Sequence, residues 1–467
     1  MDTIFTFARH VADTTFDTVP QGAIQIAKMS FLDTIGNLIA GATARACPEV
    51  ADLVLEWGGK PESTVLMRGG KVPAHNAALI NGLMARAIDF DDAMHKGMHL
   101  NASFVPVALA IAEKRGGASG RGGSSGKDVL AALALGADIA GRIDSAVAGY
   151  NGFDPTICCG IFGATTVAAK LLDLDEGQIA NAYGIALNQA SGSFQGNVDS
   201  ALSVRLNQGI AAGAGITSVL FASCGITGVK NVLEGQWGYF HLFSRGQYDP
   251  EHLTTGLGTE FYSKFTVFRR WPGCGGSQSA ADGILQLVEE NDLRPEQIEK
   301  VLVRCGRFFY NLIGQPFKIG ENPVVSAQFN IRYIVSNIIL RRRPLLDHFT
   351  ELYIRDPKIM DFTQRVEIIP DDTPLYTQPP YHNGAEVTVI LKDGRTLTRY
   401  IKSWHGHFTD PLAMDDIVEK FYRNLDYASA WFDRSVGPRI VDFVAGLEGL
   451  GDVTTLVDLL RFREQVE

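Results

Sequence analysis

The chain has 467 residues, of which 46% are hydrophobic and 20% are charged, and its formal net charge is −10. This length predicts two or three domains with a large buried core, and the composition excludes an intrinsically disordered chain. The negative charge argues against broad binding to nucleic acid or to an anionic membrane, but it is compatible with a local cationic pocket for an acidic substrate.

The N-terminal residues 1–20 lack the continuous apolar run of a signal peptide, and no stretch reaches the roughly 18 apolar residues needed to cross a bilayer. Six cysteines occur without a CxxC pair, which predicts free thiols and no structural metal site. The apolar setting of Cys158 and Cys159, in ICCGIFGA, favours buried packing residues over a nucleophile. We therefore expect a cytoplasmic protein.

Residues 1–265 have the pattern of successive helices. In PQGAIQIAKMSFLDTIGNLIAGA, apolar residues recur at helical spacing from Ile24 to Ile39, and Gly41 marks the end. The helices expected after this one have thin polar faces, which indicates that they are buried on most sides.

The pattern changes near residue 266. IEKVLVRCGR and RVEIIPDD are typical of strands, and Asp393 with Gly394 predicts the turn of a hairpin. Helical patterns lie between these strands, so residues 266–400 predict an α+β domain, and residues 401–467 are helical again. The predicted fold is mainly α: a large all-helical domain (1–265 and 401–467) with an inserted, smaller α+β lid domain (266–400).

One short stretch, DFDDAMHKGMHLNAS, gathers many titratable groups between apolar flanks. A helix that continues into this stretch would place Asp89 and Asp92 three residues apart on one face. Gly97 then interrupts the regular structure and leaves His99 on a loop that we expect to face a cleft. Titratable groups between buried helices are well placed for shifted pKa values. A solvated loop with capping acids is the alternative interpretation.

The same region resembles the signature of the MmgE/PrpD family, which runs N-G-x-x-A-H-x-x-D-F-D-D and has a histidine about ten residues past the first aspartate. Further matches follow in order: SGKDVLAALALGADIAGR, FDPTICCGIFGATTVAAKLL, RRWPGCGGSQSAAD, SAQFNIRY and DGRTLTRYIKSWHGHFTDPL. The resemblance implies a homodimer whose active site lies between a helical domain and an α+β lid. It also implies chemistry without a metal or an organic cofactor.

The resemblance assigns functional positions one by one. The first aspartate is Asp89, the loop histidine is His99 and the tyrosine of the QF…Y helix is Tyr333. Other positions depart from the family pattern, with different residues in place of a threonine, two histidines and two lysines: Ala93, Asp154, Asn207, Val204 (followed by Arg205) and Arg269.

These departures change the chemistry that we expect. Arginine binds carboxylates through two hydrogen bonds but is a poor proton donor, so the pocket moves from proton shuttling towards anion binding. We expect a small di- or tricarboxylate substrate, bound by Arg205 and Arg269, with Asp92 and Asp154 as further substrate-binding candidates. Each arginine has a surface ion pair as its alternative role.

Removal of a proton from the carbon next to a carboxylate needs a base with a pKa near neutral, and His99 is the candidate. Asp89 would orient it. An epimerase also needs a second proton carrier on the opposite face, for which Lys96, Tyr150 and Tyr333 are the options.

Three functions compete. The first is a cofactor-independent epimerase that acts on an iminodisuccinate-like dicarboxylate. The second is a lyase of the same family, resembling 2-methylcitrate dehydratase or cis-aconitate decarboxylase. The third is a binding protein without catalysis, which the retained Asp89, His99 and Tyr333 disfavour.

Overall fold

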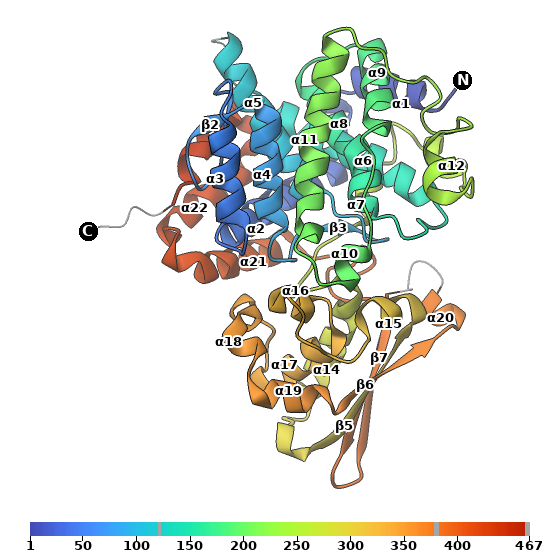
Figure 1. Ribbon diagram of the computed structural model, residues 1–467, viewed down its shortest axis with the longest axis vertical. Helices are drawn as coiled ribbons and strands as arrows, with labels where there is room; N and C mark the ends of the chain where they lie inside the picture. Colours follow the sequence, from blue (N-terminus) through green and yellow to red (C-terminus); the bar gives the residue numbers. More distant parts are fainter. Residues whose placement is uncertain (120–122, 378–382, 463–467) are drawn as a thin grey trace.

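The computed structural model describes residues 1–119, 123–377 and 383–462. It is mainly α-helical and has two parts: a larger helical part, and a smaller α+β part that occupies the lower half of Figure 1. In the described ranges, no helix is both long and apolar enough to cross a membrane.

The helical part contains α1 (Ile4–Asp13), α2 (Gln21–Gly41), α3 (Cys47–Trp57), α4 (Ala74–Arg86), α5 (Asn101–Ser119), α6 (Gly126–Ala146), α7 (Pro155–Cys158), α8 (Gly160–Leu171), α9 (Glu176–Leu187), α10 (Gln195–Val198), α11 (Ser203–Ser223), α12 (Tyr239–Ser244), α13 (Glu251–Thr254), α21 (Met414–Tyr427) and α22 (Gly437–Ala445). Its short strands are β1 (Ser63–Thr64), β2 (Lys71–Val72), β3 (Ala93–Met94) and β4 (Thr266–Val267).

The long helices pack closely because small residues lie where they cross. α2 runs through the middle of the helical part and is buried on all sides from residue 27 to residue 41. A Cβ atom at Gly41 would lie only 2.0 Å from the carbonyl oxygen of Met84 on α4, so only glycine permits this approach. The helix predicted to end at Gly41 is therefore confirmed.

The α+β part contains α14 (Gln278–Glu290), α15 (Arg307–Ile313), α16 (Pro323–Gln328), α17 (Ile331–Arg341), α18 (Glu351–Ile354), α19 (Pro357–Thr363), α20 (Pro374–Thr377), β5 (Ile298–Gly306), β6 (Val366–Asp371), β7 (Ala385–Leu391) and β8 (Thr396–Ile401). Its four strands form one sheet in the order β6-β5-β7-β8, in which only β5 and β6 run parallel. β7 and β8 pair around Asp393 and Gly394, which confirms the predicted hairpin.

Two separate hydrophobic cores underlie the two parts. The first core includes residues from α1 to Phe268 and, after the sheet, residues from Leu412 to Leu460. The second core lies almost entirely between Trp271 and Leu391. The chain therefore leaves the first core near residue 268, builds the sheet and its helices, and returns to the first core with α21 and α22.

The cysteines are all free, as the sequence predicts. Cys158 and Cys159 are fully buried, and the thiol of Cys159 donates to the carbonyl oxygen of Ala140 at 3.3 Å. Burial raises the pKa of both thiols well above their usual value, so the prediction of packing residues is confirmed.

Candidate functional site

The stretch that carries the acids is a turn, not the end of a helix. α4 ends at Arg86, and Asp89 has a left-handed backbone (φ 52°), a conformation that aspartate tolerates better than most residues. Asp89 and Asp91 contact the same two arginines, whereas Asp92 faces other partners. The helix predicted to place Asp89 and Asp92 on one face is therefore wrong.

The following loop returns the chain to the same place. The backbone N–H of Met94 donates to Met98 at 2.6 Å, Gly97 takes the positive φ (98°) of this turn, and Ala93 forms a bridge with His99. β3 also pairs with β4, just before Arg269. This pairing brings the His99 loop beside a segment that is 170 residues distant in sequence.

His99 and Arg269 meet in a buried cluster. The ring nitrogen Nδ1 of His99 lies 2.8 Å from Oδ2 of Asp91, and Nη2 of Arg269 lies 2.9 Å from Nε2 of His99. Nη1 of Arg269 donates to Asp89 at 2.8 Å, and Arg86 donates to the same carboxylate oxygen. Because Asp91 accepts the Nδ1 proton and the guanidinium can only donate, the arrangement corresponds to a neutral imidazole whose free lone pair is on Nε2.

Charge and burial act against each other in this cluster. Burial alone would raise the pKa of Asp89 and Asp91, but their partners, chiefly Arg86 for Asp89 and the hydrogen-bonded His99 together with Arg86 for Asp91, lower both values below the usual range. Burial and then the charge of Arg86 lower the pKa of His99, which favours the neutral imidazole. His99, expected to face a cleft, has a side chain that is only 11% exposed.

A cavity of about 240 Å³ lies where the two parts meet, and Arg205 lines it. Arg205 is 3% exposed, and in the described ranges no carboxylate lies within ion-pair distance of its guanidinium. Burial lowers its pKa to about 10, which still leaves it charged at neutral pH. A buried cation without a counter-ion is costly, so this guanidinium is suited to an anionic ligand in the cavity. Ala87 and Ile88, which lie between Arg86 and Asp89 in the sequence, also line the cavity, so it borders the turn that carries the cluster.

Asp154 borders the cluster on another side. Its carboxylate accepts hydrogen bonds from the backbone of Thr156 at 2.9 Å and from Nδ2 of Asn207 at 2.7 Å. The hydroxyl of Thr156 in turn accepts from the backbone N–H of His99 at 3.3 Å. Asp154 and Asn207, two of the positions that depart from the family pattern, therefore contact one another.

Asp92 lies behind the turn. It accepts hydrogen bonds from the hydroxyl of Ser30 at 2.6 Å and from the side chain of Asn101 at 2.7 Å, and it is fully buried. Burial, followed by the negative charge of Asp33, raises the pKa of Asp92 to about 7. These contacts hold the turn against α2 and α5, and none of them reaches His99.

Lys96 and Tyr150 both contact residues at the end of α6. Nζ of Lys96 donates to three carbonyl oxygens at the end of α6, including that of Val147 at 2.9 Å. The hydroxyl of Tyr150 donates to Asp144 at 2.7 Å, and burial raises its pKa well above the usual value. The structure thus gives both residues partners outside the His99 cluster.

Tyr333 lies in the second core. Its ring packs against Phe317 and Phe349, and its hydroxyl donates to the carbonyl oxygen of His348. Burial raises the pKa of this hydroxyl. The structure therefore does not bring Tyr333 to His99.

Two members of the cluster, Asp91 and Arg86, were absent from the sequence-based candidates. The alternation of acid, phenylalanine and acid at residues 89–91 has the period of two that extended backbone requires, and this signal would have paired Asp89 with Asp91. Arg86, three residues before Asp89, carries no comparable signal, because an arginine near the end of a helix is common.

The assembled groups suit one kind of chemistry. Guanidinium groups can hold carboxylates and neutralise them, while an imidazole fixed by a carboxylate can accept or deliver a proton at the neighbouring carbon. Of the two ring nitrogens, Nε2 is the one without a carboxylate partner in the described ranges, since Nδ1 is engaged by Asp91.

Two family models together match most of the chain. The model of the MmgE/PrpD N-terminal domain matches residues 6–251, and that of the MmgE/PrpD C-terminal domain matches residues 271–431. The cis-aconitate decarboxylase of Homo sapiens is 27% identical over 454 residues, which cover 94% of this chain and 90% of that protein. The cis-aconitate decarboxylase of Aspergillus terreus (strain NIH 2624 / FGSC A1156) is 26% identical over 470 residues, covering 95% and 93%. Because the N-terminal model alone spans more than half of the sequence, the chain belongs to the MmgE/PrpD family.

Proposed function

We propose that this protein is a lyase that removes carbon dioxide from a small, unsaturated tricarboxylate of the cis-aconitate type. The observation that carries the proposal is the buried contact of His99 with Asp91 on one ring nitrogen and with Arg269 on the other. The names of the similar proteins support a lyase. They lend no support to the epimerase that the sequence led us to favour.

Substrate binding rests on the guanidinium groups. Arg205, which has no carboxylate partner in the described ranges, is suited to one carboxylate of the substrate in the cavity. Arg269 is suited to a second carboxylate, because moving from His99 to the substrate exchanges a neutral acceptor for an anionic one. That movement would also free Nε2 of His99 for the reaction.

The proton requirement follows from the reaction. When carbon dioxide leaves a carbon next to a double bond, the electron pair of the broken carbon–carbon bond forms a new double bond. A proton must then reach the carbon at the far end of the original double bond. We assign delivery of this proton to Nε2 of His99. A bound polyanion would offset the charges of Arg86 and Arg269 and so raise the pKa of His99, which charges the imidazole only when substrate is present.

The test is incubation of the protein with cis-aconitate, 2-methylcitrate or iminodisuccinate in deuterated water, followed by NMR of the carbon-bound protons. The expected result is release of carbon dioxide from cis-aconitate and one deuterium in the product. Exchange of deuterium without a new product would reject the lyase in favour of an epimerase, and an unsaturated acid formed from 2-methylcitrate would indicate a dehydratase.

The matched variants are His99→Ala and His241→Ala, since His241 is exposed on α12. We expect His99→Ala to lower turnover by about 10²- to 10⁴-fold, the usual contribution of a general acid or base. His241→Ala should behave as the unaltered protein. Full turnover in a folded His99→Ala variant would remove His99 from the mechanism.

A further inference from the structure

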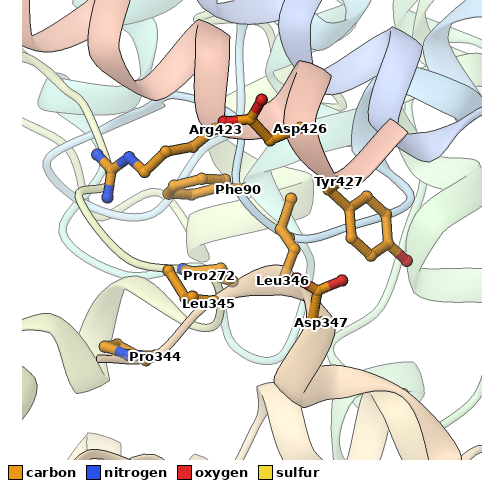
Figure 2. A pocket seen from close by; sticks show the side chains of 9 residues that line it. All are labelled: Phe90, Pro272, Pro344, Leu345, Leu346, Asp347, Arg423, Asp426 and Tyr427. Atoms are coloured by element: carbon orange, nitrogen blue, oxygen red, sulfur yellow. The ribbon is translucent and has the colours of Figure 1, made fainter. Parts of the chain in front are cut away.

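A second cavity, of about 130 Å³, lies between α21 and the α+β part (Figure 2). The ring of Phe90 lines it, whereas the neighbouring Asp89 and Asp91 contact the His99 cluster on the other side of the same turn. The two sites therefore share one short segment of backbone. A cavity of about 150 Å³ can hold a molecule as large as benzene, so this one has room for a small ligand.

One face of α21 builds the upper wall of the cavity and also holds the turn. Lys420, Arg423 and Tyr427 follow at intervals of three and four residues, which places them on the same side of the helix. Nζ of Lys420 donates to the carbonyl oxygen of Phe90 at 2.6 Å, and both Arg423 and Tyr427 line the cavity. Any ligand that contacts Arg423 therefore acts on the helix that fixes Phe90.

Arg423 lines the cavity, and two more arginines, Arg270 and Arg343, lie two residues and one residue before the lining prolines. The lining also contains two carboxylates, Asp347 and Asp426, and Asp426 pairs with Arg434. Arg423 and Arg270 lie against the same indole ring, that of Trp271, at 5.7 Å and 4.7 Å from its centre. Their nearest carboxylates are Glu419 at 3.9 Å and Asp282 at 3.7 Å.

The third arginine, Arg343, directly precedes the cavity-lining Pro344 and has no carboxylate at ion-pair distance in the described ranges. The Nε atom of Arg423 is buried and has no hydrogen-bond partner there. Burial lowers the pKa of Arg423, and the charges of Arg270 and Arg343 lower it further.

Arg142, which is fully buried, shows how this protein satisfies a guanidinium when no ligand is needed. Arg142 pairs with Asp138 at 3.0 Å and also donates to three backbone carbonyl oxygens, those of Leu253, Thr255 and Glu260. In the described ranges Arg423 has no such set of partners, and its side chain is 27% exposed. The contrast indicates that Arg423 can donate to a further partner from outside the described chain.

We propose that a small oxyanion, a carboxylate or a phosphate, binds at the Arg423 end of the cavity and links Arg423 of the helical part to Arg270 and Arg343 of the α+β part. Figure 2 shows the Arg423 guanidinium on one side of Phe90 and Asp347 with Tyr427 on the other, so the anion is expected beside Arg423 and away from Asp347. Its effect would be to hold the two parts together directly behind the His99 turn. The binding does not depend on the reaction proposed for His99.

Calorimetric titration of the full chain with inorganic phosphate and, separately, with malonate tests this site. Ionic strength is held constant with sodium chloride, because the charges are partly exposed. The variants are Arg423→Gln, Arg343→Gln and, as a matched control, Arg439→Gln, which removes an exposed charge from the neighbouring α22. Arg343 is exposed, so its replacement leaves the fold intact even if Arg423→Gln does not fold.

We expect one or both probes to bind the unaltered protein, and binding to weaken at least about tenfold in Arg423→Gln, as for the loss of a charge-assisted hydrogen bond. Arg343→Gln should weaken binding by about threefold or more, and Arg439→Gln should not weaken it. Binding of phosphate alone or malonate alone would identify the class of anion. The bound probe should also slow hydrogen exchange of the backbone amides at residues 345–349.

Three results would overturn the proposal. The first is failure of both probes to bind the unaltered protein. The second is equal affinity of Arg423→Gln, Arg343→Gln and Arg439→Gln for the probe. The third is binding that survives in Arg423→Gln but disappears in Arg205→Gln, which would place the anion in the larger cavity. None of these measurements requires turnover, so they remain informative if no substrate is converted.

Discussion

The Nδ1 atom of His99 lies 2.8 Å from Oδ2 of Asp91, and the Asp91 side chain is fully buried. A carboxylate in this position fixes the tautomer of an imidazole and stabilises its protonated form. Because Asp91 is not exposed, it acts on the reaction only through the groups that it contacts, chiefly His99 and, at 3.6 Å, Arg269. Asp91 is therefore a positioning residue of the proposed lyase.

The first prediction concerns this contact. Asp91→Asn keeps the shape of the side chain but removes its charge, so a protonated His99 is no longer stabilised. We expect turnover of cis-aconitate to fall by about 10²- to 10⁴-fold, by analogy with carboxylate-to-amide changes beside catalytic histidines. Asp361→Asn, at an exposed position on α19, is the control. An Asp91→Asn variant with an unchanged pH profile and rate would limit Asp91 to a structural role.

The second prediction concerns Arg205. Arg205→Gln is expected to raise the KM for a tricarboxylate by about ten- to a hundredfold, because one charge-assisted contact with the substrate is lost. The free energy of unfolding should stay the same or increase, since the change removes a buried charge without a counter-ion. Steady-state kinetics and urea unfolding provide the two measurements.

A suitable control for Arg205 lines the same cavity. Arg45 is exposed and donates to the carbonyl oxygen of Glu321 at 3.2 Å. Arg45→Gln should change the KM by less than about threefold. Equal KM values for the two variants would mean that Arg205 does not bind the substrate.

The third prediction concerns Arg269, which contacts Asp89 and Nε2 of His99 with two different nitrogens. A lysine presents one ammonium group and cannot reach both in the same geometry. We expect Arg269→Lys to lower kcat/KM by about ten- to a hundredfold, with a change in both kcat and KM, because the residue contacts the proposed proton donor His99 and is assigned to a substrate carboxylate. Arg439→Lys, on the surface of α22, is the control for replacing an arginine with a lysine. A normal pH profile together with a normal kcat/KM would show that Arg269 only joins the two parts of the structure.

The fourth prediction is a dependence of stability on pH. The pKa of Asp92 is about 7 in the folded protein, against 3.8 for an unperturbed carboxyl, because burial and Asp33 disfavour its charged form. Between these two values the folded state binds more protons than the unfolded state, so Asp92 makes the protein less stable as pH rises through this window. Above about pH 7 this loss of stability is complete.

The side chain of Asp92→Asn cannot ionise. Relative to that of the unaltered protein, the free energy of unfolding of this variant should therefore increase from pH 4 to pH 7, by up to about 4 kcal/mol. Urea unfolding at several pH values measures the difference, with Asp361→Asn as the exposed control. Stability curves that run parallel across this range would show that Asp92 is already ionised in the folded state.

Local structure was predictable wherever one signal acts over neighbouring residues. The helix that ends at Gly41 and the hairpin around Asp393 and Gly394 follow from apolar spacing and from turn residues, and both are present. The turn at residues 86–92 was not predictable in the same way. Its apolar flanks fit a helix, and only the left-handed Asp89, held by Arg86 and by Arg269 from a distant segment, interrupts it.

The candidate site was also predictable only in part. His99, Asp89 and Arg269 were candidates from the sequence, and the structure brings these three together. Lys96 and Tyr150 were chosen because they can carry a proton, but residue type does not reveal the partner, and both are engaged at the end of α6. The homodimer, the cytoplasmic location and any movement of the α+β part as a lid remain predictions.

The sequence by itself determined the mainly helical fold, the family and the residue types available for chemistry, because apolar periodicity, turn residues and collinear motifs are local properties of the chain. Only the tertiary structure decided that Asp91 rather than the predicted Asp89 contacts the His99 ring, and that Arg205 is buried without a counter-ion in the described ranges. The reason is physical: pairing of β3 with β4 brings distant charges into one buried volume. There, burial and neighbouring charge set the role of each group.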